Sequence, residues 1–437
     1  MKKSLKIKSC PQISDLIMDI DVNTLTLNQL TKLQQQYGNI FSVNSSKNIT
    51  SYFINDPTLI KALLIKNHSN YRKGPGFERI KMLLGNGLIV SDGDTWRRAR
   101  TMIQPTFARQ NIHKLIQKMV TCSINRAEAW NILIKDKQSI NITKEMSEFA
   151  LELILRSIFG DDYNNLADDN GENPFSFLIK DTTRDLSVVM KMRNLRNTLL
   201  SIITMRRKQQ NTNDYDFLVM YLNATDKQGN KFTDTELIDE IITLIVAGYE
   251  TSAGTLNWAW YLLSTRPDEA DKLRAESQPI FKDSSNISYE AISSMHYTQA
   301  ILEETLRLYP PVWLFSRQST NNDQLEEYEI AVNSNLFVSP YILHRSIEFW
   351  DDPNKFDPGR FITSNGEKVT NKAYFPFSLG PRRCLGEYFS FLEMKIHLGY
   401  LINKYRIIDT EKNNPKLNLG INLRSRDDIF LQLEHRP

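Results

Sequence analysis

Residues 377–386 read FSLGPRRCLG, and this stretch decides how the rest of the chain is interpreted. An apolar run follows it from Leu385 (LGEYFSFLEMKIHLGYLI), which predicts a helix that begins directly after Cys384. Backbone N–H groups and the positive end of a helix stabilise a thiolate. Gly380 permits an unusual backbone turn, and Gly386 lets the start of the helix approach a bound group closely. The stretch therefore predicts a thiolate ligand rather than an inert buried thiol.

The composition is that of a globular protein, because 41% of the 437 residues are hydrophobic and 24% are charged. Lys and Arg number 54 against 51 for Asp and Glu, so we expect no nucleic-acid partner bound through many phosphates. Cys10, Cys122 and Cys384 form no paired framework, which favours a reducing cytoplasm. The longest apolar run, within residues 241–249, is too short to span a bilayer. We therefore expect a cytoplasmic protein without a transmembrane anchor.

Helix-like and strand-like patterns separate clearly along the chain. Three segments read as β-rich and two as helical: about 38–55, 312–345 and 416–433, then about 57–308 and 385–404. The sequence predicts a mainly α protein with a small β region (α+β), built as a single domain over residues 1–437. We expect the strands near both ends of the chain to share one small sheet beside a large helical body.

The strongest helix prediction runs from Thr233 to about Thr265. Thr233 and Glu236 form a capping box at its start. At about 1.5 Å per residue the helix is roughly 48 Å long, so it crosses the whole molecule. It contains the sequence AGYETS at residues 247–252, and a glycine inside a helix costs about 1 kcal/mol relative to alanine. Close approach of a ligand would explain that glycine, although the segment taken alone fits a core helix with a local kink.

The pattern F-x-x-G-x-R-x-C-x-G in residues 377–386 resembles the haem-binding loop of the cytochrome P450 family of haem-thiolate monooxygenases, soluble bacterial type. The resemblance implies the cytochrome P450 fold, with haem b (iron protoporphyrin IX) between the long central helix and the helix that follows the cysteine. It implies that Cys384 ligates the iron and that its thiolate adds the electron density that favours O–O cleavage of O2. Four neighbours are implied to hold the cofactor: Phe377, which shields the sulfur, Arg382, which pairs with a propionate, and Gly380 and Gly386.

The resemblance extends to the central helix. In the family this place is a groove of small residues over the haem, which Ala247 and Gly248 match here. An acid and a threonine follow in the family, as Glu250 and Thr251 do in this chain. The resemblance implies that Thr251 donates a hydrogen bond to iron-bound dioxygen and that Glu250 helps to feed protons from solvent.

Three arginines and a tryptophan resemble the family's anchors for the haem carboxylates. Trp96 and Arg100 lie at i and i+4, on one face of a predicted helix. Arg317 matches a further propionate-binding position beyond Pro311. A single arginine is more often a solvated surface charge, but together with Arg382 these residues are better interpreted as partners of two carboxylates.

Glu304 and Arg307 stand at i and i+3 on one face of a helix that ends at a pair of prolines. Alone they would form a surface ion pair worth under about 1 kcal/mol. In the family the same E-x-x-R forms a buried structural network, completed by a downstream arginine that Arg360 matches. Gly359 stands where the family usually has a glutamate, which puts the detail of the network in doubt.

The substrate pocket is the least determined part of the prediction. Candidate lining residues are Ile89, Val246 and Leu314, which fit a plain core equally well. The interval 160–247 is short for the family and predicts a compact or rearranged roof over the pocket. The turn at residues 331–335 lacks the usual proline and glycine, so an asparagine there, at 333 or 335, should adopt a positive φ.

The resemblance implies a monooxygenase that inserts one oxygen atom from O2 into an apolar substrate, by hydroxylation or epoxidation. The substrate would be a fatty acid, a terpenoid or an intermediate of secondary metabolism. Electrons would come from a separate ferredoxin or flavodoxin with its NAD(P)H reductase. Arg97, Arg98 and Arg383 are candidates for a basic docking face, with a merely solvated face as the plain alternative.

Two alternative functions stay open at this point. The first is a peroxide-driven haem peroxygenase, or a haem-thiolate isomerase or dehydratase that needs no external electrons. The pair Glu250 and Thr251 argues against it, because those side chains suit the handling of protons for dioxygen. The second is a non-enzymatic haem sensor, for which no output module is visible in the sequence.

Overall fold

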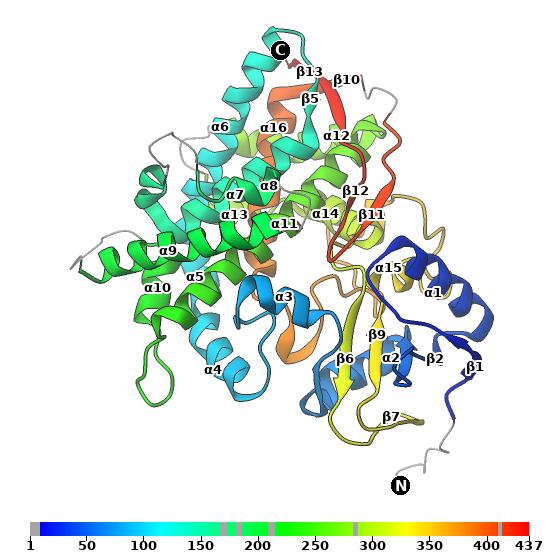
Figure 1. Cartoon of the computed structure of the whole chain (residues 1–437). Helices are drawn as coiled ribbons and strands as arrows, with labels where there is room; N and C mark the ends of the chain where they lie inside the picture. The colour runs from blue at the N-terminus through cyan, green and yellow to red at the C-terminus, as the bar shows by residue number, and fades with distance from the viewer. Residues whose placement is uncertain are drawn as a thin grey trace. The chain divides into compact units, whose positions relative to one another are not determined.

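The computed structural model describes residues 9–166, 173–180, 186–208, 215–282, 287–409 and 413–436 (Figure 1). The chain divides into two compact units, each made of three segments. The first unit comprises Met1–Glu78, Ala300–Cys384 and Pro415–Asp427, and the second comprises Arg79–Gln299, Leu385–Asn414 and Asp428–Pro437. The prediction of one domain over the whole chain is not decided by this division and stays a prediction.

A six-stranded sheet organises the first unit. Its strand order is β1 (Gln12–Ile17), β2 (Ile40–Asn44), β3 (Thr50–Ile54), β9 (Asn335–Val338), β6 (Phe315–Ser319) and β4 (Tyr71–Lys73). The predicted hairpin is confirmed, because β2 and β3 pair antiparallel from Ile40 opposite Ile54 to Asn44 opposite Thr50. β3 then pairs in parallel with β9, so segments far apart in the sequence join in the middle of the sheet. Two hairpins complete the strands of this unit: β7 (Asp323–Leu325) with β8 (Tyr328–Ile330), and β11 (Leu417–Leu419) with β12 (Leu423–Ser425).

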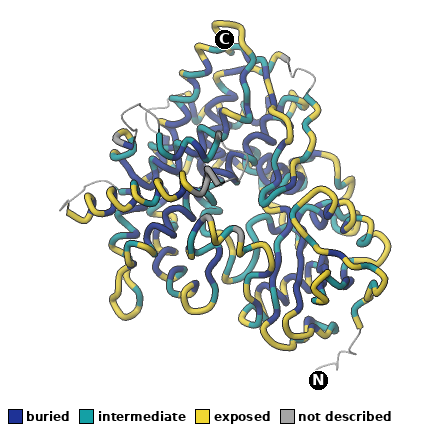
Figure 2. The backbone as a smooth tube through the Cα atoms, viewed as in Figure 1, coloured by how far each residue is buried: buried dark blue, intermediate teal, exposed yellow. Residues whose placement is uncertain are grey.

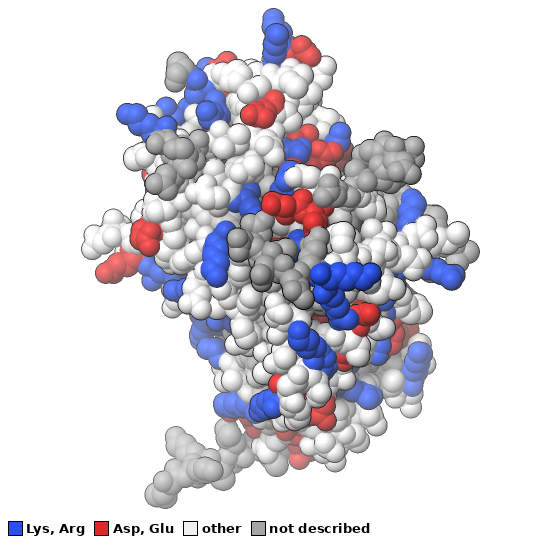
Figure 3. All heavy atoms as spheres, turned by 90° about the vertical axis from the view of Figure 1, so that its left-hand side faces the viewer, with Lys and Arg blue, Asp and Glu red and all other residues white. Residues whose placement is uncertain are grey.

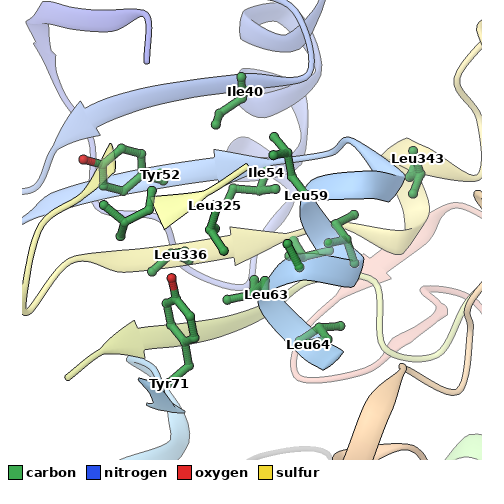
Figure 4. Close-up of a cluster of buried hydrophobic side chains, with 14 of the residues drawn as sticks. Ile40, Tyr52, Ile54, Leu59, Leu63, Leu64, Tyr71, Leu325, Leu336 and Leu343 are labelled. Carbon is green, nitrogen blue, oxygen red and sulfur yellow. The ribbon is translucent and has the colours of Figure 1, made fainter. Parts of the chain in front are cut away.

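Short helices surround this sheet. They are α1 (Thr24–Tyr37), α2 (Pro57–Lys61) with the π-helical turn Ala62–Lys66, and α15 (Pro340–Leu343). In Figure 4, apolar side chains of the strands and of α2 point toward one another, Ile54, Leu59, Leu63 and Leu336 among them. The four central strands are largely buried and run dark blue in Figure 2. Strands that are buried on both faces read as continuous apolar runs, which is why β9 shows no alternation.

The second unit is a helical body. Its principal helices are α4 (Gly93–Ile103), α6 (Ile116–Lys135), α7 (Ile142–Phe159), α9 (Leu186–Lys208), α10 (Phe217–Asn223), α11 (Asp234–Ser264), α12 (Pro267–Phe281) and α16 (Glu387–Lys404). Shorter helices are α3 (Phe77–Leu84), α5 (Arg109–Ile112), α8 (Phe177–Lys180) and α13 (Tyr289–Ser293), while α14 spans His296–Leu308. α11 packs along α7, and α16 packs against α6 and α12. Trp130, Trp258 and Trp260 are fully buried in this body.

The long central helix is confirmed with its predicted start. Thr233 and Glu236 form both bonds of the capping box, and α11 runs from Asp234 to Ser264. Because a capping box is made by residues three apart, local sequence is enough to place it. Asn333 has φ +60°, which also confirms the positive φ expected in the turn before β9. The mainly α prediction with a small β region is confirmed.

The prediction that the strands near both chain ends share one sheet is confirmed for segments 38–55 and 312–345, because β2, β3, β6 and β9 lie in the six-stranded sheet, and it is wrong for the last segment, 416–433. β13 (Phe430–His435) pairs instead with β10 (Tyr405–Asp409) and β5 (Ile140–Asn141), in a separate sheet of the second unit. β10 begins directly after α16 and pairs antiparallel with β13, although the β11–β12 hairpin lies between them in the sequence. β11 and β12 are separated by a short turn and form their own antiparallel hairpin.

Candidate functional site

The loop before α16 has an unusual backbone. Ser378 and Gly380 have φ values of +63° and +70°, and a 3-10 turn spans Gly380–Arg382. The N–H of Cys384 donates to the carbonyl of Phe377 at 3.0 Å, which closes the loop on itself. A Cβ on Gly380 would lie 2.1 Å from the carbonyl oxygen of Leu64. Gly380 is therefore required both for its φ and for the close approach of another backbone.

Cys384 differs from the other two cysteines in its surroundings. Cys384 is exposed, whereas Cys122 is buried and Cys10 is half-buried. Burial raises the pKa of Cys10 to about 12 and raises that of Cys122 strongly, so both stay protonated thiols. Cys384 lies two residues before Gly386, the N-cap of the 18-residue helix α16. Among the three, only Cys384 combines access with a helix N-terminus, the setting that favours a thiolate ligand.

The residues of α11 that were predicted to face a cofactor lie on an incompletely buried stripe. α11 is mostly buried, but Ala247, Gly248, Thr251 and Gly254 are intermediate in burial, at spacings of one, three and three residues. This spacing places them on one face of the helix. The hydroxyl of Thr251 donates to the carbonyl of Ala247 at 2.8 Å. Small residues and one hydroxyl therefore lie on a partly exposed stripe of α11.

Gly248 has a structural reason besides any ligand. A Cβ at this position would lie 2.9 Å from Cδ1 of Ile154 on α7. The close packing of α7 on α11 thus already requires a glycine here. Gly248 alone is no independent evidence for a cofactor, and its place in a cofactor groove stays a prediction. Val246 and Ala247, the two residues before Gly248, are half-buried.

A buried carboxyl group that sequence reasoning missed lies beside Thr251. The hydroxyl of Ser252 donates to the carboxyl group of Glu393 on α16, and both residues are buried. Burial raises the pKa of Glu393 to about 8, so this side chain holds its proton at neutral pH. The signal in the sequence was an acid inside the apolar run of residues 385–402. Glu250, the residue before Thr251, is also buried, with 8% of its surface exposed.

Glu304 and Arg307 form a fully buried pair in the first unit. Arg307 donates to both carboxylate oxygens of Glu304, at 2.6 and 2.7 Å. Its remaining donors reach three carbonyls, those of residues His344, Pro353 and Lys355, at 2.6 to 3.0 Å. The structure brings Arg360 to 3.4 Å from the same carboxylate. Burial raises the pKa of Glu304, and the two arginines act in the opposite direction.

Gly359 leaves no gap in this network. The N–H of Asp357 donates to Glu304 at 2.9 Å, and the side chain of Asp357 accepts from the N–H of Gly359 at 3.0 Å. A backbone donor and a side-chain cap thus organise the turn that carries Arg360 without a glutamate at position 359. His344, for which no chemical role is expected, is fully buried and accepts from the N–H of Phe375. Burial lowers its pKa to about 3, so it stays neutral.

The predicted carboxylate anchors are divided between the units. Arg317 on β6 is buried in the first unit, donates to the carbonyl of Ser316 and stacks on Phe315. Arg382 in the 3-10 turn is half-buried. In the second unit, Trp96 is buried on α4, and Arg100 one turn later is half-buried and bonded to Gln104. The guanidinium of Arg317 belongs to the group type that binds carboxylates most specifically.

The pocket candidates are similarly divided. Leu314 is buried in the first unit, next to the fully buried Trp313. Ile89 and Val246 are half-buried in the second unit. The structure therefore assigns each a position, and their common role in a pocket stays a prediction.

The arginines expected to form a docking face are partly used elsewhere. Arg98 binds Asp226 and Glu236, at 2.8 Å each, and Arg97 pairs with Asp94 at 2.6 Å. Arg383 is exposed. On the face drawn in Figure 3, basic and acidic side chains are interspersed, in keeping with the balanced composition. Arg98 thus serves the packing of α4 rather than a free basic surface.

The chain belongs to the cytochrome P450 family, whose family model matches residues 17–426. Cyclooctatin synthase of Streptomyces melanosporofaciens is 29% identical over 384 residues, which cover 84% of this chain and 83% of that protein. Pentalenene oxygenase of Streptomyces avermitilis is 26% identical over 366 residues, or 80% of each chain. A crystal structure of the cytochrome P450DA heme domain matches with a TM-score of 0.84 over 99% of both chains at 21% identity, and so shows the same fold.

The protein is therefore a cytochrome P450 monooxygenase, with haem bound through a cysteine thiolate and O2 as co-substrate. The exposed thiol of Cys384 and the glycine-dependent loop around it fit this cofactor. In the part of the chain that the structure describes, no helix is long and apolar enough to cross a membrane.

Replacing Gly380 tests whether the loop depends on its contact with Leu64. Gly380→Ala should sharply lower the haem content, because the added Cβ meets the Leu64 carbonyl at 2.1 Å. Gly366→Ala is a matched control, since Gly366 also has a positive φ (+81°) but nothing within 4 Å of a Cβ. The control should cost only the backbone strain, about 1 kcal/mol of unfolding free energy. Haem per protein and denaturant midpoints measure both, and equal haem content in the two variants would contradict the assignment.

Proposed function

We propose that Cys384 is the thiolate ligand of the haem iron in this monooxygenase. The observation that carries the proposal is the exposed thiol of Cys384 at the N-terminal end of α16, in a loop closed by its own backbone. When bound, the haem supplies the activation of O2 from which one oxygen atom enters the substrate. Phe377 shields the sulfur from water, and Gly380 and Gly386 keep the backbone close to the cofactor.

The arginines and Trp96 hold the two carboxylates of the cofactor in this proposal. Arg317 supports this proposal because it is buried on β6 and its planar guanidinium can bind a carboxylate through two hydrogen bonds. Arg100, Arg382 and Trp96 add donors from α4 and from the loop. Glu304, Arg307 and Arg360 do not touch the cofactor but fix the segment that leads to Cys384.

Thr251 and Glu250 manage protons on the oxygen side. The hydroxyl of Thr251 is bonded to the Ala247 carbonyl, so it can donate to a ligand by rotation about one side-chain bond. Glu250 is a nearly buried acid one residue before it and can pass protons inward. Thr251 lies on the partly exposed stripe of α11, and Glu250 is the residue before it. This position supports a role in handling protons for O2, and so favours a monooxygenase over the peroxygenase and isomerase alternatives.

We propose that the substrate is an apolar terpenoid-like molecule rather than a fatty acid. Ile89, Val246 and Ala247 offer apolar, half-buried surface in the second unit, and Leu314 is the apolar candidate of the first. One relative is named for the oxygenation of pentalenene, and this name supports a compact hydrocarbon substrate. Electrons come from a separate ferredoxin or flavodoxin with its NAD(P)H reductase.

Exchange of the cysteine tests the ligand directly. Cys384→Ser should abolish the thiolate signature in the spectrum of the reduced carbonyl adduct, because the hydroxyl is not an anionic ligand at neutral pH. Cys10→Ser and Cys122→Ser should keep that signature. A thiolate spectrum that persists in Cys384→Ser would refute the assignment.

Thr251→Ala tests the proton role. Haem content and substrate affinity should stay unchanged, while product formed per electron consumed falls by about 10-fold or more and peroxide rises, because a positioned proton donor is lost. Thr251→Ser should restore coupling. Thr255→Ala is the matched control, since the buried Thr255 hydroxyl makes the same type of bond, to the Thr251 carbonyl at 2.8 Å. Equal coupling in wild type and Thr251→Ala would eliminate the role.

A ligand panel tests the substrate class. Sesquiterpene and diterpene hydrocarbons or alcohols should shift the iron spin state at micromolar concentrations, and C12–C18 fatty acids should do so only weakly. The candidate lining residues are apolar, so burying the carboxylate of a fatty acid beside them costs free energy that a terpenoid hydrocarbon does not incur. A stronger response to fatty acids than to any terpenoid would reverse the proposed preference while leaving the haem assignment intact.

A further inference from the structure

Two neighbouring carboxyl groups on α11 bind the backbone of the segment that precedes α4. Asp239 and Glu240 are 7% and 5% exposed. Asp239 accepts from the N–H of Asn86 at 2.7 Å, and Glu240 accepts from the N–H of Leu88 at 3.0 Å. All of these residues belong to the second unit. Two backbone donors of one short segment are thus held by one turn of the central helix.

The same segment lies too close to α11 for side chains at two positions. A Cβ on Gly85 would lie 2.0 Å from Oδ1 of Asp239, and a Cβ on Gly87 would lie 2.2 Å from Oγ1 of Thr243. Gly85 also has φ +81°, a value that side chains rarely adopt. The two glycines therefore let the backbone reach the carboxyl groups, and any larger residue would lift the segment from the helix.

Arg196 of α9 completes the arrangement. It forms an ion pair with Asp239, so three separate parts of the chain meet at this one carboxylate. The C-terminal end of α9 is tied separately, because Arg207 pairs with Asp234 at 2.7 Å and Arg206 binds Asp216 at 2.9 Å. Arg196 therefore connects the middle of α9 to α11 through Asp239.

The contact of Asp239 and Glu240 with residues 86–88 adjoins two residues of the proposed pocket. Asp239, Thr243 and Val246 lie on one face of α11, at spacings of four and three residues. Ile89 follows Leu88, whose N–H is bound by Glu240. The segment held by the two acids is thus the one that carries Ile89, and the face that holds it continues to Val246.

We propose that Asp239 and Glu240 are positioning residues for the substrate: they fix residues 85–88 on α11, with Arg196 as the counter-ion, and so set the place of Ile89. The proposal rests on the proposed function, in which Ile89 and Val246 contact an apolar substrate. It adds the groups that hold this wall in place. These acids do not react; they act through the backbone N–H groups of Asn86 and Leu88.

Proton binding should modulate this positioning. Burial raises the pKa of Glu240 from 4.5 to about 7, the Leu88 N–H acts against this, and Asp239 and Glu236 on the same helix add to it. Three further groups come from the helices packed against this turn. Arg196 of α9 pairs with Asp239, Arg98 of α4 pairs with Glu236, and Tyr221 of α10 interacts electrostatically with Glu240. Lifting the segment would expose Glu240 and return its pKa toward 4.5. The form in which residues 85–88 lie on α11 therefore binds the proton of Glu240 more tightly than the lifted form. This form is most favoured below pH 4.5, and it loses that advantage as pH rises through about 7.

The variants Asp239→Asn and Arg196→Ala test the proposal in the haem-loaded full chain. The probe is 4-phenylimidazole, an apolar ligand that coordinates haem iron, and unsubstituted imidazole is its small counterpart. Each variant should raise the Kd of 4-phenylimidazole roughly 10-fold, since each removes one charged bond of the clamp, and should leave the Kd of imidazole unchanged. The double variant should raise this Kd by no more than about the larger of the two single effects, because both changes break the same ion pair. Arg196→Lys should recover part of the affinity.

Arg193→Ala is the matched control, because Arg193 lies on the same helix and is exposed. Its Kd values should equal those of the wild type. Hydrogen exchange of the Asn86 and Leu88 amides gives a readout that does not depend on the pocket. Exchange should accelerate in Asp239→Asn and Arg196→Ala and not in Arg193→Ala. Unchanged exchange would show that no clamp exists, and faster exchange with unchanged Kd for 4-phenylimidazole would show that the clamp does not position a ligand.

Glu240→Gln supplies the pH test. Wild-type affinity for 4-phenylimidazole, corrected for titration of the free ligand, should weaken as pH rises from about 5 to about 7 and then level off, and the glutamine variant should lack this dependence. The same dependence in both proteins would overturn the role of Glu240. If wild-type haem protein binds imidazole but not 4-phenylimidazole, the proposed apolar pocket fails, and the positioning role fails with it. Accelerated exchange in the variants would then still distinguish that failure from the absence of a clamp.

Discussion

The buried pair of Glu304 and Arg307 is the constraint on which the first unit depends. Both side chains are fully buried, so their charges are tolerable only because each is saturated with partners. Arg307 binds the carboxylate and three carbonyls from the segment 344–355, which leads along the chain toward the cysteine loop. Removing one partner of such a pair typically costs about 3–5 kcal/mol. The pair therefore anchors the segment 344–355, which precedes the cysteine loop in the sequence.

The central helix combines two demands in the second unit. It packs on α7 closely enough to need Gly248, and its start is fixed by the capping box at Thr233. Polar side chains inside it, such as Ser252 and Asp239, are each bound by a partner from another segment. A buried polar group is expensive when it is unpaired, so these bonds also fix which parts of the chain lie against the helix. The same helix can therefore organise the unit and present Thr251.

Local patterns of the sequence predicted local structure well. The capping box, the hairpin of β2 and β3, and the positive φ at Asn333 depend on residues a few positions apart, and the structure has all three. The family motifs located the cysteine loop and the E-x-x-R pair, whose members the structure brings together with Arg360. The wrong prediction concerned which strands pair across the chain. Pairing of short strands is decided by the packing of the helices between them, which no single strand encodes.

The residues that sequence reasoning missed share one property. Asp239 meets Asn86, and Glu393 meets Ser252, across more than a hundred positions of sequence. An acid in an apolar helix is visible in the sequence, but its partner is not. Gly248 shows the converse, because the glycine was noticed and its neighbour Ile154 was not. One-dimensional patterns thus locate unusual residues and leave the reason for them to the fold.

The contact of Gly380 with the carbonyl of Leu64 has a consequence for biosynthesis. Leu64 and Gly380 are far apart in the sequence. A Cβ on Gly380 would lie 2.1 Å from the carbonyl oxygen of Leu64, so the two backbones are in close contact. During translation the turn that carries Leu64 must wait until the segment around Gly380 has left the ribosome before this contact can form. Such a distant pairing is slow to form, because the intervening chain must first be ordered. Loading of the prosthetic group is therefore expected to be one of the last events in the maturation of this protein.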